Sequence, residues 1–272
     1  MSTNENKDKK AEVTALQAIS AEDRKDWISL AFVQAGICVC VPAFLLGALL
    51  AEAMPIWPAI ISGSLGYLIV VVGMVATGMI GCDLGLASCT CCQAGFGKSG
   101  ARFIVSTIFA VNMIGWFGIQ NGVCGEAFSN AMLAMTGWDI PVVVSNTIWG
   151  IIMLLTAVYG VHALEKLDKI SIPLLMIIMC YGTFLAFKVY GTGNLNDEGT
   201  VQSMSFMSGV ALSFNFTAVG TITGPDYTRF QKSRKDTVKS VFYGVFPMGV
   251  ITLIMGIVLT KLSGQYDISM VL

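Results

Sequence analysis

Three side chains near the middle of the sequence are spaced so that they share one face of a helix. Asn112, Trp116 and Gln120 follow one another at intervals of four residues. An indole ring can stack on a flat heterocycle, and a neighbouring amide can meet the edge of that ring with both a donor and an acceptor. The competing explanation is a helix-packing tryptophan with amides that bond between helices. The pattern therefore predicts either a binding wall for a planar ligand or a packed helix face.

Two apolar segments are interrupted by polar or helix-breaking residues. The first contains Gln34, Gly36 and Pro42. The second is denser in such residues, namely Asn215, Thr217, Gly220, Thr221, Thr223, Gly224 and Pro225. Irregular backbone at membrane depth is tolerated where protein or a water-filled cavity satisfies it, and it exposes carbonyl groups that can hold a cation. We expect breaks in both helices, the clearer one in the second, with glycine packing or a simple proline kink as the alternative.

The elements that position these residues must be membrane helices. Hydrophobic residues make up 55% of the chain and charged residues 12%, and the mean hydropathy is +0.73, values typical of a protein dissolved in a lipid bilayer. Crossing the hydrocarbon takes roughly 20 helical residues. Apolar segments of this length predict seven spans, at about 27–51, 55–80, 101–128, 141–162, 170–190, 203–224 and 238–262.

Basic residues predict the orientation of these spans, because lysine and arginine are retained on the cytoplasmic side in short loops. With a cytoplasmic N-terminus, only Lys188 and Lys261 of the 16 basic residues lie outside. The cytoplasmic ones are Lys7, Lys9, Lys10, Arg24, Lys25, Lys98, Arg102, Lys166, Lys169, Arg229, Lys232, Arg234, Lys235 and Lys239. We therefore expect residues 1–25 to be a cytoplasmic tail and residue 272 to lie on the outer side of the cell membrane.

Several other functions have little support in the sequence. A cluster of four cysteines, Cys82, Cys89, Cys91 and Cys92, has no partner histidine and lacks the spacing of a zinc site. We therefore expect a thiol cluster in a cytoplasmic loop and no metal site, with acylation or metal binding as the alternatives. No span carries a nucleophile and base pair, which argues against an enzyme. The charge distribution does not indicate a nucleic acid partner.

The chain resembles the nucleobase:cation symporter-1 family, and within it the cytosine permeases and their hydantoin and purine relatives. The segments that carry the resemblance are Arg24-Lys25, Ala31-Phe32-Val33 with Gly36, Gly115-Trp116-Phe117-Gly118, Gly160-Val161 with Ala163-Leu164, Gly220-Thr221 and Asp226-Tyr227-Thr228-Arg229-Phe230. The last segment is the most specific. The resemblance implies an inverted-repeat, leucine-transporter-type fold of membrane helices in which the first and sixth helices are broken.

The same resemblance implies where the fold is incomplete. Relatives have about twelve spans, so the seven expected here make a complete first five-helix repeat, 26–190, and a partial second repeat, 200–272. The eighth helix, which normally contributes cation ligands, lies beyond this sequence. We therefore expect no sodium-stimulated uptake by residues 1–272 alone.

The resemblance also assigns roles to particular residues. Trp116 is similar to the family's stacking tryptophan, Gln120 to the substrate-binding amide of hydantoin-type members, and Phe216 to the aromatic residue on the opposite side of the ligand. Asn215 matches a residue whose backbone faces the base. Gly36 and Val39 match positions whose carbonyl groups bind the cation.

The function implied is coupled uptake of a planar nucleobase, cytosine or a related purine or hydantoin. Sodium or a proton would be the coupling ion, and no cofactor is expected. The alternative from another class is a membrane fragment or sensor-like binding module that transports nothing.

Overall fold

The described part of the chain is built from helices. The computed structural model describes residues 16–158, 161–192, 195 and 204–264. The long helices are α1 (Trp27–Cys38), α2 (Val41–Ala53), α3 (Ile56–Leu84), α6 (Ser106–Thr136), α7 (Val142–Val158), α8 (Val161–Tyr190), α9 (Phe206–Thr217), α10 (Val219–Thr228) and α11 (Arg234–Ser263). The short α4 (Ser88–Cys91), α5 (Gln93–Gly100) and the π-helix η2 (Ala101–Val105) connect α3 to α6.

The predicted spans coincide with these helices. In the described part of the chain, five helical segments are long and apolar enough to cross a membrane, and α1 and α2 make a sixth if the bent pair is counted as one span. The fourth predicted span corresponds to α7, which is apolar but shorter. The all-helical fold class is therefore confirmed.

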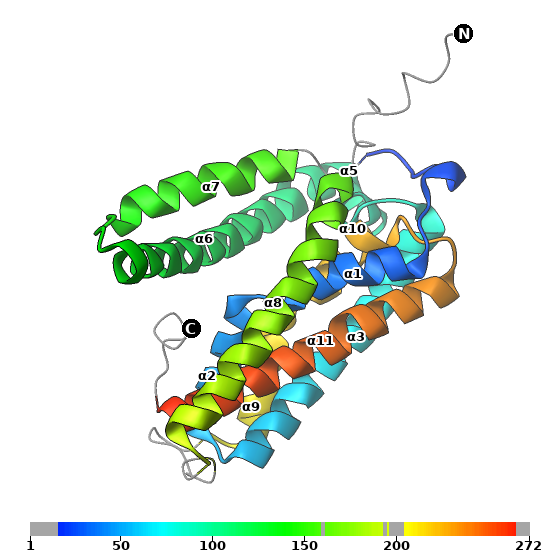
Figure 1. Ribbon diagram of the computed structural model, residues 1–272. Coiled ribbons are helices and arrows are strands. Elements are labelled where there is room, and N and C mark those ends of the chain that lie inside the picture. Colours follow the sequence, from blue (N-terminus) through cyan, green and yellow to red (C-terminus); the bar gives the residue numbers. More distant parts are fainter. Residues whose placement is uncertain (1–15, 159–160, 193–194, 196–203, 265–272) are drawn as a thin grey trace.

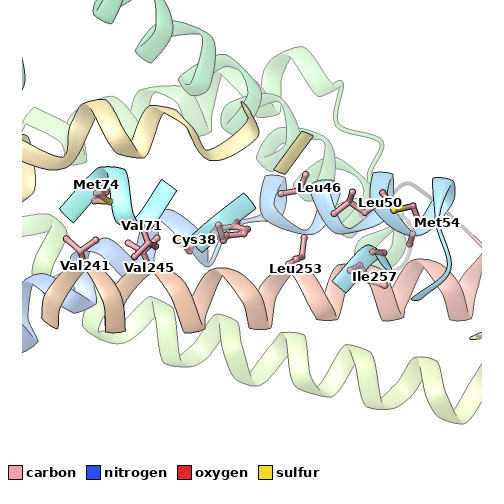
Figure 2. Close-up of a cluster of buried hydrophobic side chains, with 13 residues drawn as sticks. Cys38, Leu46, Leu50, Met54, Val71, Met74, Val241, Val245, Leu253 and Ile257 are labelled. Atoms are coloured by element: carbon pink, nitrogen blue, oxygen red, sulfur yellow. The ribbon is translucent and has the colours of Figure 1, made fainter. Parts of the chain in front are cut away.

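The central bundle consists of α2, α3 and α11, with α1 and the α9–α10 pair packed against it. Figure 2 shows Val241, Val245, Leu253 and Ile257 on one face of α11, directed at the helices above it. Glycines allow the backbones to approach closely. A Cβ atom at Gly256 would lie 2.5 Å from the carbonyl oxygen of Phe44, so α2 and α11 touch through their main chains.

The first span is broken, as predicted. α1 ends at Cys38, the backbone of Cys40 is extended at φ −146° and ψ 156°, and α2 starts at Val41 in a direction bent by 52°. Pro42 lies in the first turn of α2, where its missing N–H costs no helical hydrogen bond.

The sixth span is more regular than predicted. Its interruption is confined to Ala218, whose dihedral angles remain helical at φ −56° and ψ −29°. The prediction that this helix carries the clearer break is therefore wrong. Pro225 is accommodated inside α10.

Polar residues of this span contact the neighbouring α3, and Thr221 is the one among them that the sequence had marked as an interruption. The hydroxyl of Ser213 donates to the carbonyl of Gly63 at 2.7 Å, and that of Thr228 donates to Gly78 at 2.7 Å. The Thr77 hydroxyl of α3 in turn donates to the carbonyl of Thr221 at 2.7 Å. Hydroxyl groups in membrane helices often serve such contacts between helices.

The helices α6 and α7 form a hairpin at one side of the molecule (Figure 1), and their main packing partner is each other. Apolar side chains such as Ile108, Val111 and Ile114 are exposed along α6. Such a surface is suited to contact with hydrocarbon or with further apolar helices.

Candidate functional site

A cavity of about 210 Å³ lies where the break between α1 and α2 meets α3, α6, the α9–α10 pair and α11. Trp116, Gln120 and Phe216 line it, so the structure brings three of the six predicted site residues together. Cys38 and Cys40, which flank the break, line it as well. The broken first helix therefore forms one wall of the cavity.

Trp116 and Gln120 of the predicted α6 face line the cavity, whereas Asn112 is exposed and is not among the lining residues. Trp116 and Gln120 are one helical turn apart, and both are half-buried. Gln120 and Cys40, on the facing α1–α2 break, line the same cavity. The α6 wall thus offers a flat aromatic surface beside a group that can both donate and accept a hydrogen bond.

Phe216 contacts Trp116 directly. The two ring centroids are 5.4 Å apart and the rings are nearly perpendicular, at 87°. Such an edge-to-face pair is a favourable aromatic geometry. A planar ligand held between the two rings, as the resemblance implies, would require one of them to turn.

Asn215 lies apart from this cluster. Its side chain is exposed on α9, and it is not among the residues that line the cavity. Because the sixth span remains helical on both sides of Ala218, the main chain at Asn215 is not opened by an unwound segment. The structure does not bring this residue to the cavity.

The predicted cation ligands lie at the end of α1, next to the cavity but not in its lining. The N–H of Val39 donates to the carbonyl of Ala35 at 2.9 Å. The next backbone hydrogen bond runs from the N–H of Ala43 to the carbonyl of Cys40 at 3.1 Å. Within the described part of the chain, no backbone donor reaches the carbonyl oxygens of Gly36 and Val39. These oxygens are the type of ligand that a hard cation requires.

Tyr67 and the two cysteines at the break are lining residues that sequence reasoning missed. Cys38 and Cys40 stand four and two residues before Pro42, so their position near a helix break was a usable signal. Tyr67 had no such signal, because it lies inside a continuous apolar segment. It is 1% exposed and belongs to the buried cluster of the bundle.

The other polar groups of the cavity are mostly engaged within their own helix. The hydroxyl of Thr217 donates to the carbonyl of Ser213 at 2.8 Å, and the hydroxyl of Thr223 donates to the carbonyl of Val219 at 3.1 Å. The remaining wall is largely aliphatic, aromatic or sulfur-containing. A pocket that is mainly apolar, with few polar groups, is typical of a binding site for a small uncharged ligand.

The sequence from residue 19 to residue 271 matches the model of a family described as permeases for cytosine/purines, uracil, thiamine and allantoin. The chain belongs to this permease family. It is therefore a multi-pass membrane protein of a transporter family and not an enzyme, as predicted.

Curated members of the permease family are similar over most of the chain. Cytosine permease of Escherichia coli is 27% identical over 250 residues, covering 90% of this chain and 57% of the relative. Purine-uracil permease NCS1 of Arabidopsis thaliana is 25% identical, covering 81% of this chain and 41% of the relative. Allantoin permease of Bacillus subtilis is 23% identical, covering 82% of this chain and 50% of the relative. The chain thus spans about half the length of these permeases.

Solved structures share the permease fold. The nucleobase-cation-symport-1 family transporter Mhp1, in a closed conformation with bromovinylhydantoin bound, has a TM-score of 0.84 at 18% identity. The match covers 94% of this chain and 59% of Mhp1. The inward-facing conformation of Mhp1 gives a TM-score of 0.78. The predicted family and the leucine-transporter-type fold, present here in part, are both confirmed.

Proposed function

We propose that this chain forms part of a cation-coupled symporter that imports a planar nucleobase, cytosine or a related purine or hydantoin. The observation that carries the proposal is the cavity at the broken first helix, where the indole of Trp116, the ring of Phe216 and the amide of Gln120 meet. Stacking and edge hydrogen bonding are the interactions that recognise a flat nitrogenous ring. The names of the related permeases, which include cytosine, purine-uracil and allantoin permeases, support the same ligand class.

The coupling ion is proposed to bind beside this cavity. The carbonyl oxygens of Gly36 and Val39 are available at the end of α1, and a sodium ion prefers oxygen ligands of this kind. Coupling by protons is the alternative. Base binding measured with sodium or potassium at fixed pH, and then across pH in potassium, separates the two: a rise in affinity with sodium supports the carbonyl site, and dependence on pH alone rejects it.

The membrane orientation is part of the proposal. Residues 26–190 are assigned to the first repeat and 200–272 to the start of the second, with the tail 1–25 in the cytoplasm. Because nearly all basic residues then lie on one side, a reporter fused after Leu272 should be external. A cytoplasmic reporter at this position would contradict seven spans with an internal N-terminus.

The decisive experiment measures binding and uptake separately. The purified product of the complete gene should bind tritiated cytosine, uracil or allantoin in a saturable manner, and Trp116→Ala should weaken that binding. Uptake is then measured in cells that express the complete gene. Binding without uptake by the complete gene product would favour a binding module that does not transport, and absence of binding to all three compounds would reject the nucleobase site.

A further inference from the structure

A second cavity, of about 250 Å³, adjoins the first. The two cavities share Met113, Thr223 and Tyr227 as wall residues. Their volumes are similar, so a ligand that fits one is not too large for the other. Three side chains therefore separate two compartments of comparable size.

The two compartments lie one after the other along α6. Phe109 and Met113 line the second, and Met113, Trp116 and Gln120 line the first. At a rise of 1.5 Å per residue, Phe109 and Gln120 are about 16 Å apart along the helix axis. The second compartment lies toward the α6 end nearest Arg102, which the proposed orientation places at the cytoplasm.

Arg229 gives this second compartment its chemical character. The residue is only 7% exposed and lines the cavity. Its Nε and Nη1 atoms are buried and have no acceptor in the part of the chain that the structure describes. Its one close contact with a ring is to Phe230, at 4.8 Å from the centroid. Two buried guanidinium nitrogens without acceptors are costly, so the site favours a ligand that supplies acceptors for them.

A carboxylate in the wall of this cavity is occupied elsewhere. Asp226 accepts hydrogen bonds from the backbone N–H of Ser88 at 3.0 Å and from its hydroxyl at 2.7 Å. Each carboxylate oxygen thus already holds one donor from α4. Asp226 lines the same cavity, but these bonds direct it to α4.

The chain around Arg229 is held in place by the N-terminal segment. The N–H of Lys25 donates to the carbonyl of Phe230 at 2.7 Å, and the Arg24 guanidinium donates to the carbonyl of Gln231 at 2.9 Å. Arg229 is therefore anchored at its backbone while part of its guanidinium remains unpaired. Such preorganisation lowers the entropic cost of binding a ligand.

The geometry points to a second, cytoplasm-side binding site on the transport path, in which the guanidinium of Arg229 binds the carbonyl oxygens of a planar base. Leu30, Val33, Phe109 and Phe230 supply apolar and aromatic walls for the ring. The planar fork of arginine suits ligands with carbonyl oxygens, such as uracil and allantoin, better than adenine, which has none. This inference rests on the proposed function and adds a second binding site to it.

The test is the stoichiometry of uracil binding to the purified 272-residue chain. Wild-type protein should bind two molecules per folded chain. Arg229→Gln should weaken one site by about 10- to 100-fold, the loss expected for a hydrogen bond to a charged donor, and leave the other site unchanged. Trp116→Ala should weaken binding at the first site and leave the second site, beside Arg229, unchanged. Adenine should bind at the first site only.

Two further variants separate binding from folding. Phe109→Trp fills the second cavity without altering Arg229 and should abolish the same site, whereas Ile108→Trp, on the exposed face of α6, should not. Arg234→Gln removes an exposed arginine and serves as the charge control. A single site that is sensitive to Trp116→Ala but not to Arg229→Gln or Phe109→Trp would overturn the second site and leave the proposed function intact. Absence of any base binding would overturn the proposed function itself.

Discussion

Glycine serves opposite purposes in the central bundle and on the α6 segment from Gly115 to Gly122. Cβ atoms placed at Gly47 and Gly256 would lie 2.5 Å from carbonyl oxygens of the facing helix. At Gly115, Gly118 and Gly122 of α6, the added atom would meet nothing within 4 Å. The bundle is therefore packed through its main chains, whereas α6 presents its site residues from a sparsely packed helix. Substitutions in the two regions should act on different properties, folding in the first and binding in the second.

The largest effect is expected for Gly256→Val. The side chain would collide with the backbone of Phe44, which cannot move without separating α2 from α11, and overpacking of this kind costs about 3 kcal/mol or more. The matched control is Gly122→Val on α6, where space is open. Folded protein, measured by size-exclusion chromatography in detergent after graded heating, should be largely lost in the first variant and retained in the second. Equal loss in both would contradict the contrast between the regions.

Trp116→Ala should reduce base affinity by about 5- to 150-fold, because stacking on a base contributes roughly 1–3 kcal/mol. Trp116→Phe keeps an aromatic face and should weaken binding less. Gln120→Ala should change the preference among bases more than Trp116→Phe does. Affinity is normalised to folded protein, with Trp138→Ala, at an exposed residue, as the control. Unchanged normalised affinity in Trp116→Ala would show that this residue only packs between helices.

Thr228→Val tests the hydroxyl contacts that hold the sixth span on α3. The buried hydroxyl lies 2.7 Å from the carbonyl of Gly78 and 2.9 Å from that of Gly224. Its removal should lower stability by about 1 kcal/mol. Thr107→Val is the counterpart on α6, since its exposed hydroxyl bonds only to the preceding turn at Phe103. The melting temperature of both variants is measured in detergent. A decrease for Thr107→Val as large as that for Thr228→Val would rule out the interhelical hydrogen bond as the cause.

The smallest effect is expected for Arg234→Gln. This side chain forms a bidentate ion pair with Asp83, but the two side chains are 66% and 40% exposed. Exposed pairs contribute little and are screened by salt. The melting temperature should fall slightly at low ionic strength and match the wild type at high salt. A decrease in melting temperature that persists at high salt would indicate that the ion pair is shielded from solvent.

Local features of the sequence determined the membrane helices and one wall of the site. Hydropathy located the spans, Pro42 and its neighbours located the break in the first helix, and four-residue spacing placed Trp116 and Gln120 on one face. Each of these depends on residues within a few turns of one another, so the physical cause is contained in a short segment. The family motifs added Phe216, which local spacing alone does not select.

Tertiary structure decided which polar and small residues face a cavity and which face another helix. Thr221 was among the residues expected to interrupt the sixth span, yet its carbonyl accepts a hydrogen bond from Thr77 of α3, 144 positions away. Arg229 looked like an ordinary cytoplasmic charge, yet it is buried against a cavity. A hydroxyl or a glycine has the same local signature whether its neighbour is a ligand, a helix or lipid. Only the packing of segments far apart in the chain distinguishes these environments.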